Sequence, residues 1–373
     1  MGVNRSGYIM IFTLLIVGAV MMIVTYVGHR GSFYLPFSHM LFAREKAEML
    51  AFGGIQVAIA QLSQVDKENQ SSSAKATENK TEDKSADTSK KETGAASEQS
   101  FLLRILPTLN RWQEFDLKEN VDGVDGQIKI CLMCEEGKIN LNRIIDFKKN
   151  EFKGNDQPAR QSPGEGGSGW KAIMQELCKS IEKLTKSDNL FPVLEKIVKD
   201  AKYEFNDATE LITRKEFASF KDTLFYEPPT QKKRDTLYLT DIFTVWSSSE
   251  KIEPWLFSDS INALLGLPRV EVDDIKKRKE QAEGWIKNFK ERANWQQDWT
   301  TMLLPVYGKE LRTLPKHIDS MLSTNFAPRF FSVLVHGKVG QVTQRVYAIL
   351  ERNKRLQSDI TEYDVAIKKL YWL

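Results

Sequence analysis

The chain has 373 residues, with 53 Lys and Arg against 50 Asp and Glu, so its formal net charge at pH 7 is +3. This even balance argues against a partner bound through bulk charge, such as nucleic acid. Only three cysteines and four histidines are present. No histidine lies at a metal-binding spacing from another histidine or a cysteine, and we assign no metal ligand and no cofactor.

An apolar run without a charge extends from Tyr8 to Val27, behind a single basic residue, Arg5. As a helix, this run would be about 30 Å long, which matches the hydrocarbon core of a bilayer. It is longer than the apolar core of a secretory signal, and the sequence around Gly28 is a poor cleavage site. The run could be a cleaved signal, a plain membrane anchor or an assembly helix. Because Arg30 follows the run closely, the flanking charges leave its orientation open.

Two glycines and a proline, Gly28, Gly31 and Pro36, follow this run and predict a loosened or kinked helix. A second helical stretch begins at Ser38. Its apolar residues recur at spacings of three and four, which is typical of one buried stripe on a helix. They are Ala43, Ala47, Leu50, Ala51, Ile55, Ala58, Ile59 and Leu62. We expect this stripe to pack on the protein's own sheet, so that anchor and core share one continuous helical spine.

The segment Asp66–Ser100 contains no Val, Ile, Leu, Met, Cys or aromatic residue. It cannot bury enough apolar area to offset the entropy that is lost on ordering. We therefore predict a disordered, solvated linker between the N-terminal helix and the rest of the chain.

Strand patterns lie on both sides of a mostly helical middle. One predicted hairpin pairs Gly126–Cys134 with Gly137–Asn142 through a turn at Glu135–Gly137, and the other pairs Phe330–Gly340 with Thr343–Arg352. Helices are predicted between them, over Lys171–Leu184, Phe191–Tyr203, Ser258–Leu265 and Asp274–Arg292. The expected fold is α+β, with a small antiparallel sheet on the N-terminal helix and a large α-helical insertion.

Motifs for chemistry are weak. Cys131 and Cys134 lie in a strand-like run, where positions i and i+3 face opposite sides, so we expect buried cysteines and not a redox pair. The acidic residues of Asp122–Gly126 and Glu135–Glu136 could bind calcium, but they lack the EF-hand spacing. There is no Gly-x-Ser-x-Gly, P-loop or convincing dinucleotide motif. Three tryptophans are expected to pack or to form an interface patch: Trp285, Trp295 and Trp299. An enzyme is therefore the weaker hypothesis.

Both ends of the chain resemble pilin-like proteins. Arg5-Ser6-Gly7 before a long apolar helix is similar to a prepilin-type signal, which prepilin peptidase cuts after the glycine. Other segments resemble, in order, the general secretion pathway protein K (GspK) family of minor pseudopilins: Ala43–Ala51, Glu135–Asn142, Ala208–Ile212, Leu239–Ser247 and Phe330–Glu351. The Asp66–Ser100 insertion and the break at Gly31 and Pro36 depart from that family's pattern.

The resemblance implies a pilin-like fold whose N-terminal helix packs on the sheet. The domains that it implies are a prepilin-type leader over residues 1–7, a transmembrane and amphipathic helix over 8–62, a disordered charged linker over 63–100, the first part of a pilin-like α+β domain over 101–145, an inserted α-helical domain over 146–325, and the closing strands over 326–373.

The resemblance also implies a role in assembly. Cleavage after Gly7 would make Tyr8 the first residue and Phe12 the fifth, a position where most pilin-like subunits carry Glu and proteins of the K type typically lack it. A charge that is left unpaired in a bilayer is costly, and a tip subunit has no earlier subunit whose amine could pair with it. The residues expected to pack against partner helices are Phe12, Leu14, Leu15, Val17 and Val20.

The implied protein is a minor pseudopilin at the tip of the type II secretion pseudopilus, where it nucleates assembly for protein export. It would span the inner membrane once, with its C-terminal domain in the periplasm. The implied partners are other minor pseudopilins, the major pseudopilin and prepilin peptidase. Two alternatives stay open: a minor type IV pilin of a pilus or DNA-uptake machine, and a membrane-anchored periplasmic enzyme or binding protein.

Overall fold

The computed structural model describes residues 5–64, 101, 104–154, 169–228, 236–268, 295–315, 318–323, 328–357 and 360–373. The predicted linker at Asp66–Ser100 and the predicted helix at Asp274–Arg292, with Trp285, lie outside these residues. The description below therefore concerns the N-terminal helix, one large sheet and the greater part of the segment between its second and third strands.

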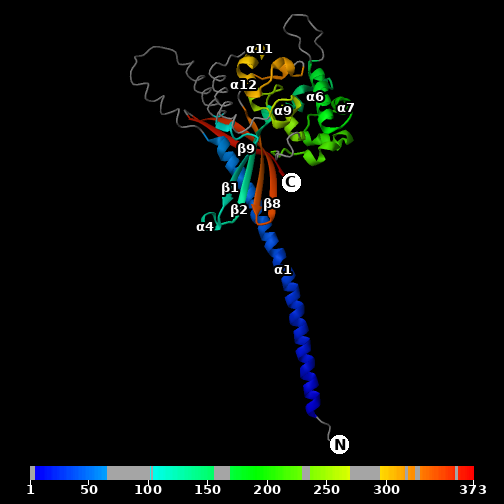
Figure 1. Cartoon of the computed structure of the whole chain (residues 1–373), viewed down its shortest axis with the longest axis vertical. Helices are drawn as coiled ribbons and strands as arrows, with labels where there is room; N and C mark the ends of the chain where they lie inside the picture. The colour runs from blue at the N-terminus through cyan, green and yellow to red at the C-terminus, as the bar shows by residue number, and fades with distance from the viewer. Residues whose placement is uncertain are drawn as a thin grey trace, which may run out of the picture.

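The first element is a single helix, α1 (Arg5–Ser63), that runs through Gly28, Gly31 and position 36 without interruption (Figure 1). The predicted break there is wrong. A Cβ at Gly28 or Gly31 would meet no atom within 4 Å, so no tertiary contact bends the chain at these points. One glycine costs a helix only about 1 kcal/mol relative to alanine, and the many other turns of α1 support the local loss.

Five strands form one antiparallel sheet in the order β1-β2-β7-β8-β9. They are β1 (Trp112–Leu117), β2 (Gly126–Cys134), β7 (Phe330–Val339), β8 (Val342–Gln357) and β9 (Ile360–Trp372). The predicted hairpin of β7 and β8 is confirmed, with Val339 opposite Val342 and Gly340 at a φ of 56° in the turn. The edge strand β9 was not predicted.

Helix α1 lies across β7, β8 and β2 on one face of this sheet (Figure 1). The predicted stripe is buried there, since five of its members are fully inaccessible: Ala47, Ala51, Ile55, Ala58 and Leu62. Small side chains let the helix backbone approach the sheet, and a Cβ on Gly337 of β7 would collide with the backbone at Ala47 and Ala51. The α+β fold with a long N-terminal helix packed on an antiparallel sheet is confirmed.

The predicted first hairpin is wrong in its second strand. Residues Glu135–Gly137 form a 3-10 turn after β2, and β3 (Ile139–Asn140) then pairs in parallel with β6 (Phe243–Thr244). The neighbours of β2 are β1 and β7. Pairing with β7 gives β2 a long register of apolar partners, whereas a two-residue return strand offers little burial, so the distant partner prevails over the local one.

The segment between β2 and β7 is mostly helical. Its principal helices are α6 (Trp170–Thr185), α7 (Leu190–Asp200) and α9 (Asp259–Leu264), which confirm three of the predicted helices. Shorter elements are α5 (Leu141–Ile144), α8 (Leu239–Ile242), α11 (Trp295–Asp298), α12 (Leu304–Tyr307), α13 (Ile318–Met321), the 3-10 helices Ala208–Thr213, Lys215–Thr223, Pro254–Leu256 and Leu311–Thr313, a π-helical turn at Trp299–Leu303, and the strand pair β4 (Ile145–Asp146) and β5 (Glu151–Phe152). A further short helix, α4 (Glu119–Asp122), joins β1 to β2.

This helical segment lies at the end of the sheet that is remote from the N-terminus of α1 (Figure 1). It also reaches the sheet face opposite α1, where Tyr226 and Tyr238 pack with Cys131 and Tyr347. The sheet is thus enclosed on one face by α1 and, over part of the other face, by the inserted segment. The apolar N-terminal half of α1 stands clear of both.

Candidate assembly helix and its junction with the globular part

The N-terminal half of α1 exposes the residues that were predicted to form an assembly surface. Phe12, Leu14, Leu15, Val17 and Val20 are 52–68% exposed. Figure 1 shows this half of the helix projecting away from the sheet. A continuous apolar surface of this size is unusual on a protein in water, so these side chains require a membrane or another apolar partner.

Within the described residues, α1 is the one helix that is long and apolar enough to cross a membrane, and none of its most apolar window is buried. The Gly7–Tyr8 bond lies near the start of this helix. Cleavage at that bond stays a prediction. So does the packing of the five exposed side chains against partner helices.

The character of α1 changes near Ala47. Residues on the N-terminal side, such as Tyr34, Phe37 and Phe42, are 59–65% exposed, while Ala47 and Ala51 are completely buried against the sheet. The helix therefore connects an exposed apolar segment rigidly to the core of the globular part. A force or an orientation that is imposed on one end is transmitted to the sheet without an intervening loop.

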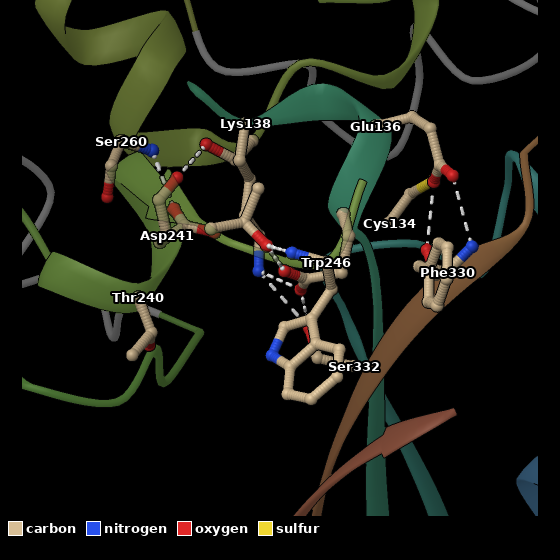
Figure 2. A network of polar contacts seen from close by, with 12 residues as sticks. Cys134, Glu136, Lys138, Thr240, Asp241, Trp246, Ser260, Phe330 and Ser332 are labelled. Atoms are coloured by element: carbon tan, nitrogen blue, oxygen red, sulfur yellow. Dashed lines mark hydrogen bonds and ion pairs between the residues drawn. The ribbon is translucent and has the colours of Figure 1, made fainter. Parts of the chain in front are cut away.

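Three of the segments that resemble the GspK family meet at one buried junction between the sheet and the inserted segment: Glu135–Asn142, Leu239–Ser247 and Phe330–Glu351. The side chain of Asn140 donates to the carbonyl oxygen of Ser247 at 2.6 Å and to its Oγ at 3.0 Å. The backbone N–H of Ser260 donates to Asp241 Oδ2 at 2.8 Å. Asn140 and Ser247 are thus joined by buried polar contacts across 107 positions of the chain. Ser260 and Asp241 belong to the same buried network (Figure 2).

An ion pair lies at the centre of this junction. Lys138 Nζ binds the carboxylate of Glu135 and donates to Ser332 Oγ at 3.2 Å, and both charged side chains are almost inaccessible. Ser332 Oγ and Thr244 Oγ1 also donate to this carboxylate. Burial is the largest effect and lowers the pKa of Lys138, but Glu135, Tyr347 and Asp241 together raise it by more, so the net pKa is raised. Lys138 is therefore held in its charged form.

A second buried cluster lies beside the first, at the end of β2. Glu136 Oε1 accepts from the backbone N–H of Arg329 at 2.9 Å and of Phe330 at 3.1 Å, and Cys134 Sγ donates to Glu136 Oε2 at 3.2 Å (Figure 2). The carbonyl oxygen of Glu136 accepts from the N–H of Glu253 at 3.0 Å. Burial raises the pKa of Glu136 to about 7. It raises the pKa of Glu253 and of the Cys134 thiol well above their usual values.

Sequence reasoning missed this junction because it placed Glu135–Gly137 in the turn of a hairpin. The one signal in the sequence was a run of charged residues between two strongly apolar segments. Buried charges must be paired, but the sequence does not show that these charges are buried. Within the described residues, no three or more His, Cys, Asp or Glu side chains are grouped so as to hold a metal ion.

Two side-chain predictions are confirmed. Cys131 packs in the cluster on the sheet face opposite α1, whereas Cys134 belongs to the main core, so the two face opposite sides of β2. Both are free thiols. Trp299 is a packing residue, fully buried and stacked on Tyr307 with ring centroids 5.8 Å apart.

In comparisons with known proteins, no family model matches the chain, and no curated protein matches it. Among solved structures, the chain is similar to the crystal structure of the GspK-GspI-GspJ complex from the enterotoxigenic Escherichia coli Type 2 Secretion System. The identity is 14% and the TM-score 0.33, and the match covers 76% of this chain and 98% of the other.

Proposed function

We propose that the protein is a minor pseudopilin of the K type, which acts at the tip of the type II secretion pseudopilus and nucleates its assembly. The observation that carries this proposal is the nature of α1. One unbroken helix supplies the exposed apolar surface of Phe12–Val20 and, further along, the fully buried stripe against the sheet.

A plain anchor requires no such continuity, because a flexible segment would tether a domain to a membrane equally well. In an assembly subunit, by contrast, the helix must hold the globular part at a defined angle to its neighbours. The large helical insertion supports a place at the tip, since a bulky domain would obstruct the packed shaft of a fibre. The role is structural and not catalytic.

In this proposal, the apolar helix spans the inner membrane and the globular part lies in the periplasm. The partners are the other minor pseudopilins and the major pseudopilin, which pack along α1, and prepilin peptidase, which cleaves between Gly7 and Tyr8. Phe12 in the fifth position of the processed chain fits a subunit that has no preceding amine to neutralise.

The test is the N-terminus of the protein isolated from cells with and without prepilin peptidase, measured by intact mass and by N-terminal sequencing. We expect a start at Tyr8 only in cells that contain the peptidase, and retention of residues 1–7 in cells without it. Substituting Gly7→Leu should block the cleavage and prevent assembly. A start at Met1 in both strains, or a start beyond Gly28, would exclude a pilin-type subunit and favour an anchored or secreted periplasmic domain.

A further inference from the structure

Glu136 ties together three segments that are distant in the sequence. It directly follows β2, and its side chain accepts from the backbone N–H groups of Arg329 and Phe330, which begin β7. Its carbonyl oxygen accepts from the N–H of Glu253, in the middle of the inserted segment. The point where the insertion leaves the sheet, the point where it rejoins the sheet and one interior segment are therefore joined at this residue.

The carboxyl group of Glu253 lies in the same buried cluster. Glu253 is 3% exposed, and among the described residues its Oε2 atom has no hydrogen-bond partner. Glu136 is 1% exposed, and its carbonyl oxygen accepts from the N–H of Glu253 at 3.0 Å. Two residues with buried carboxyl groups are thus joined through the backbone. The described donors surround the carboxyl group of Glu136, whereas Oε2 of Glu253 has none.

The cations nearest in the fold are engaged elsewhere. The guanidinium of Arg329 pairs with Glu351 of β8, and the ammonium of Lys138 pairs with Glu135. The remaining titratable neighbours are the Cys134 thiol of β2, which donates to Glu136, and the Tyr307 hydroxyl of α12, which donates to the carbonyl oxygen of Pro254. No described cation neutralises the two carboxyl groups.

Two ionised carboxylates cannot share a dry site without a cation, because burial and mutual repulsion both favour a proton on one of them. The ionised form is favoured more at Glu136 than at Glu253, since two N–H groups and one thiol donate to Glu136. Glu253, with an oxygen that lacks a donor, is the better acid. Burial raises the pKa of both groups, and the charge of Glu136 raises that of Glu253 further.

We propose that Glu253 is buried as a protonated acid beside Glu136 and that the two residues form a proton-dependent clamp that fastens the helical insertion to the sheet. With the proton present, Glu136 keeps its hydrogen bonds to the backbone N–H groups of Arg329 and Phe330 at the start of β7. Without it, two negative charges face each other in the core, and the junction opens to hydrate them. The clamp is a property of the fold and does not depend on the assembly role proposed above.

The direction in which pH changes the stability of the closed junction follows from proton linkage. Both native pKa values lie above the usual Glu value of 4.5, so the closed junction binds more protons than the open junction. The stabilisation from the clamp is complete below about pH 4.5, where Glu253 is protonated in both states. It falls as the pH rises above that value, because Glu253 ionises in the open junction before it ionises in the closed one. Each proton that is released on opening changes the opening equilibrium by at most about tenfold per pH unit.

The test is hydrogen exchange, read by mass spectrometry on the full-length protein in detergent micelles between pH 5 and pH 8.5. The readout is the protection of the Arg329 and Phe330 amides after correction for intrinsic exchange. In the wild type, we expect this protection to fall at least about tenfold as the pH rises. In Glu253→Gln, which is neutral at every pH, the dependence should be largely lost. The control Glu45→Gln alters an exposed carboxylate on α1 and should match the wild type.

Protection that is independent of pH in the wild type, or an equal fall in Glu253→Gln, would overturn the proposal. Infrared spectroscopy of the unaltered protein provides a second test that requires no variant. At pH 7, native protein should show the carbonyl stretch of a protonated carboxyl group, and this band should vanish on unfolding. A native spectrum without that band would also overturn the proposal.

Discussion

At the scale of single residues, Lys138 and Glu135 show how a buried charge specifies a fold. The pair is 0% and 2% exposed, and Ser332 and Thr244 complete its hydrogen bonds from two other parts of the chain. Desolvation makes such a pair a poor source of net stability, but removal of one member leaves an uncompensated charge in the core. The pair therefore favours the arrangement of the insertion on the sheet in which both charges and their hydrogen bonds are paired.

Substituting Lys138→Met should lower the free energy of unfolding by about 3–5 kcal/mol, because Glu135 would lose its cation in a site without water. Urea denaturation followed by tryptophan fluorescence measures this change. The matched control is Lys129→Met, which breaks the exposed pair with Glu114 and should cost less than about 1 kcal/mol. Equal losses for the two variants would show that the buried pair has no special role.

At the scale of elements, the contact between α1 and the sheet depends on residues without side chains. Gly54 faces the sheet, whereas its neighbour Gly53 faces away from it. A Cβ on Gly54 would collide with Val335 of β7 and approach the Ile128 side chain to 2.9 Å, whereas a Cβ on Gly53 would meet no atom within 4 Å. The distance between helix and sheet is therefore set by Gly54 on one side and Gly337 on the other.

Substituting Gly54→Ala should destabilise the protein by about 1–3 kcal/mol, because an added methyl group overpacks a tight interface. Gly53→Ala should leave the stability unchanged or raise it by up to about 1 kcal/mol, since alanine is the better helix former. Thermal unfolding of both variants, monitored by circular dichroism, gives the comparison. This explanation of the interface would be wrong if both substitutions changed the stability in the same direction.

At the scale of the whole molecule, the two ends of the segment between α1 and the first strand are fixed at the same place. Arg104 Nη2 donates to the carbonyl oxygens of Gln61 and Gln64 at 3.2 and 2.7 Å. Arg352 Nε donates to the carbonyl oxygen of Leu62 at 3.1 Å, and its guanidinium lies 3.6 Å from the ring centroid of Phe101. Two arginines thus satisfy carbonyl groups at the C-terminal end of α1, where the helix dipole favours a cation.

Replacing residues 67–99 with a short Gly-Ser linker should therefore leave the fold intact. Closing a shorter loop loses less entropy, and reducing the length about fourfold should raise the free energy of unfolding by about 1 kcal/mol. Urea denaturation of the shortened protein measures this. A loss of several kcal/mol would mean that the replaced segment packs on the core. As a control, Arg104→Met should destabilise both the long and the short form.

Local pattern carried most of what the sequence predicted correctly. The apolar run in the N-terminal half of α1, the buried stripe further along it, the hairpin of β7 and β8, and the helices α6, α7 and α9 are each encoded by a period or a turn within some 20 residues of chain. The opposite orientation of Cys131 and Cys134 followed from the alternation of a strand in the same way.

The sequence by itself therefore determined most of the long helices and strands and which of their faces are apolar. Only the tertiary structure decided the pairing of β2 with β7 and the burial of Glu135, Glu136 and Lys138. These features depend on contacts between residues up to about two hundred positions apart. The free energy of such contacts comes from burial and charge pairing between segments that meet only in the folded chain. The periodic pattern of the local sequence therefore does not predict them.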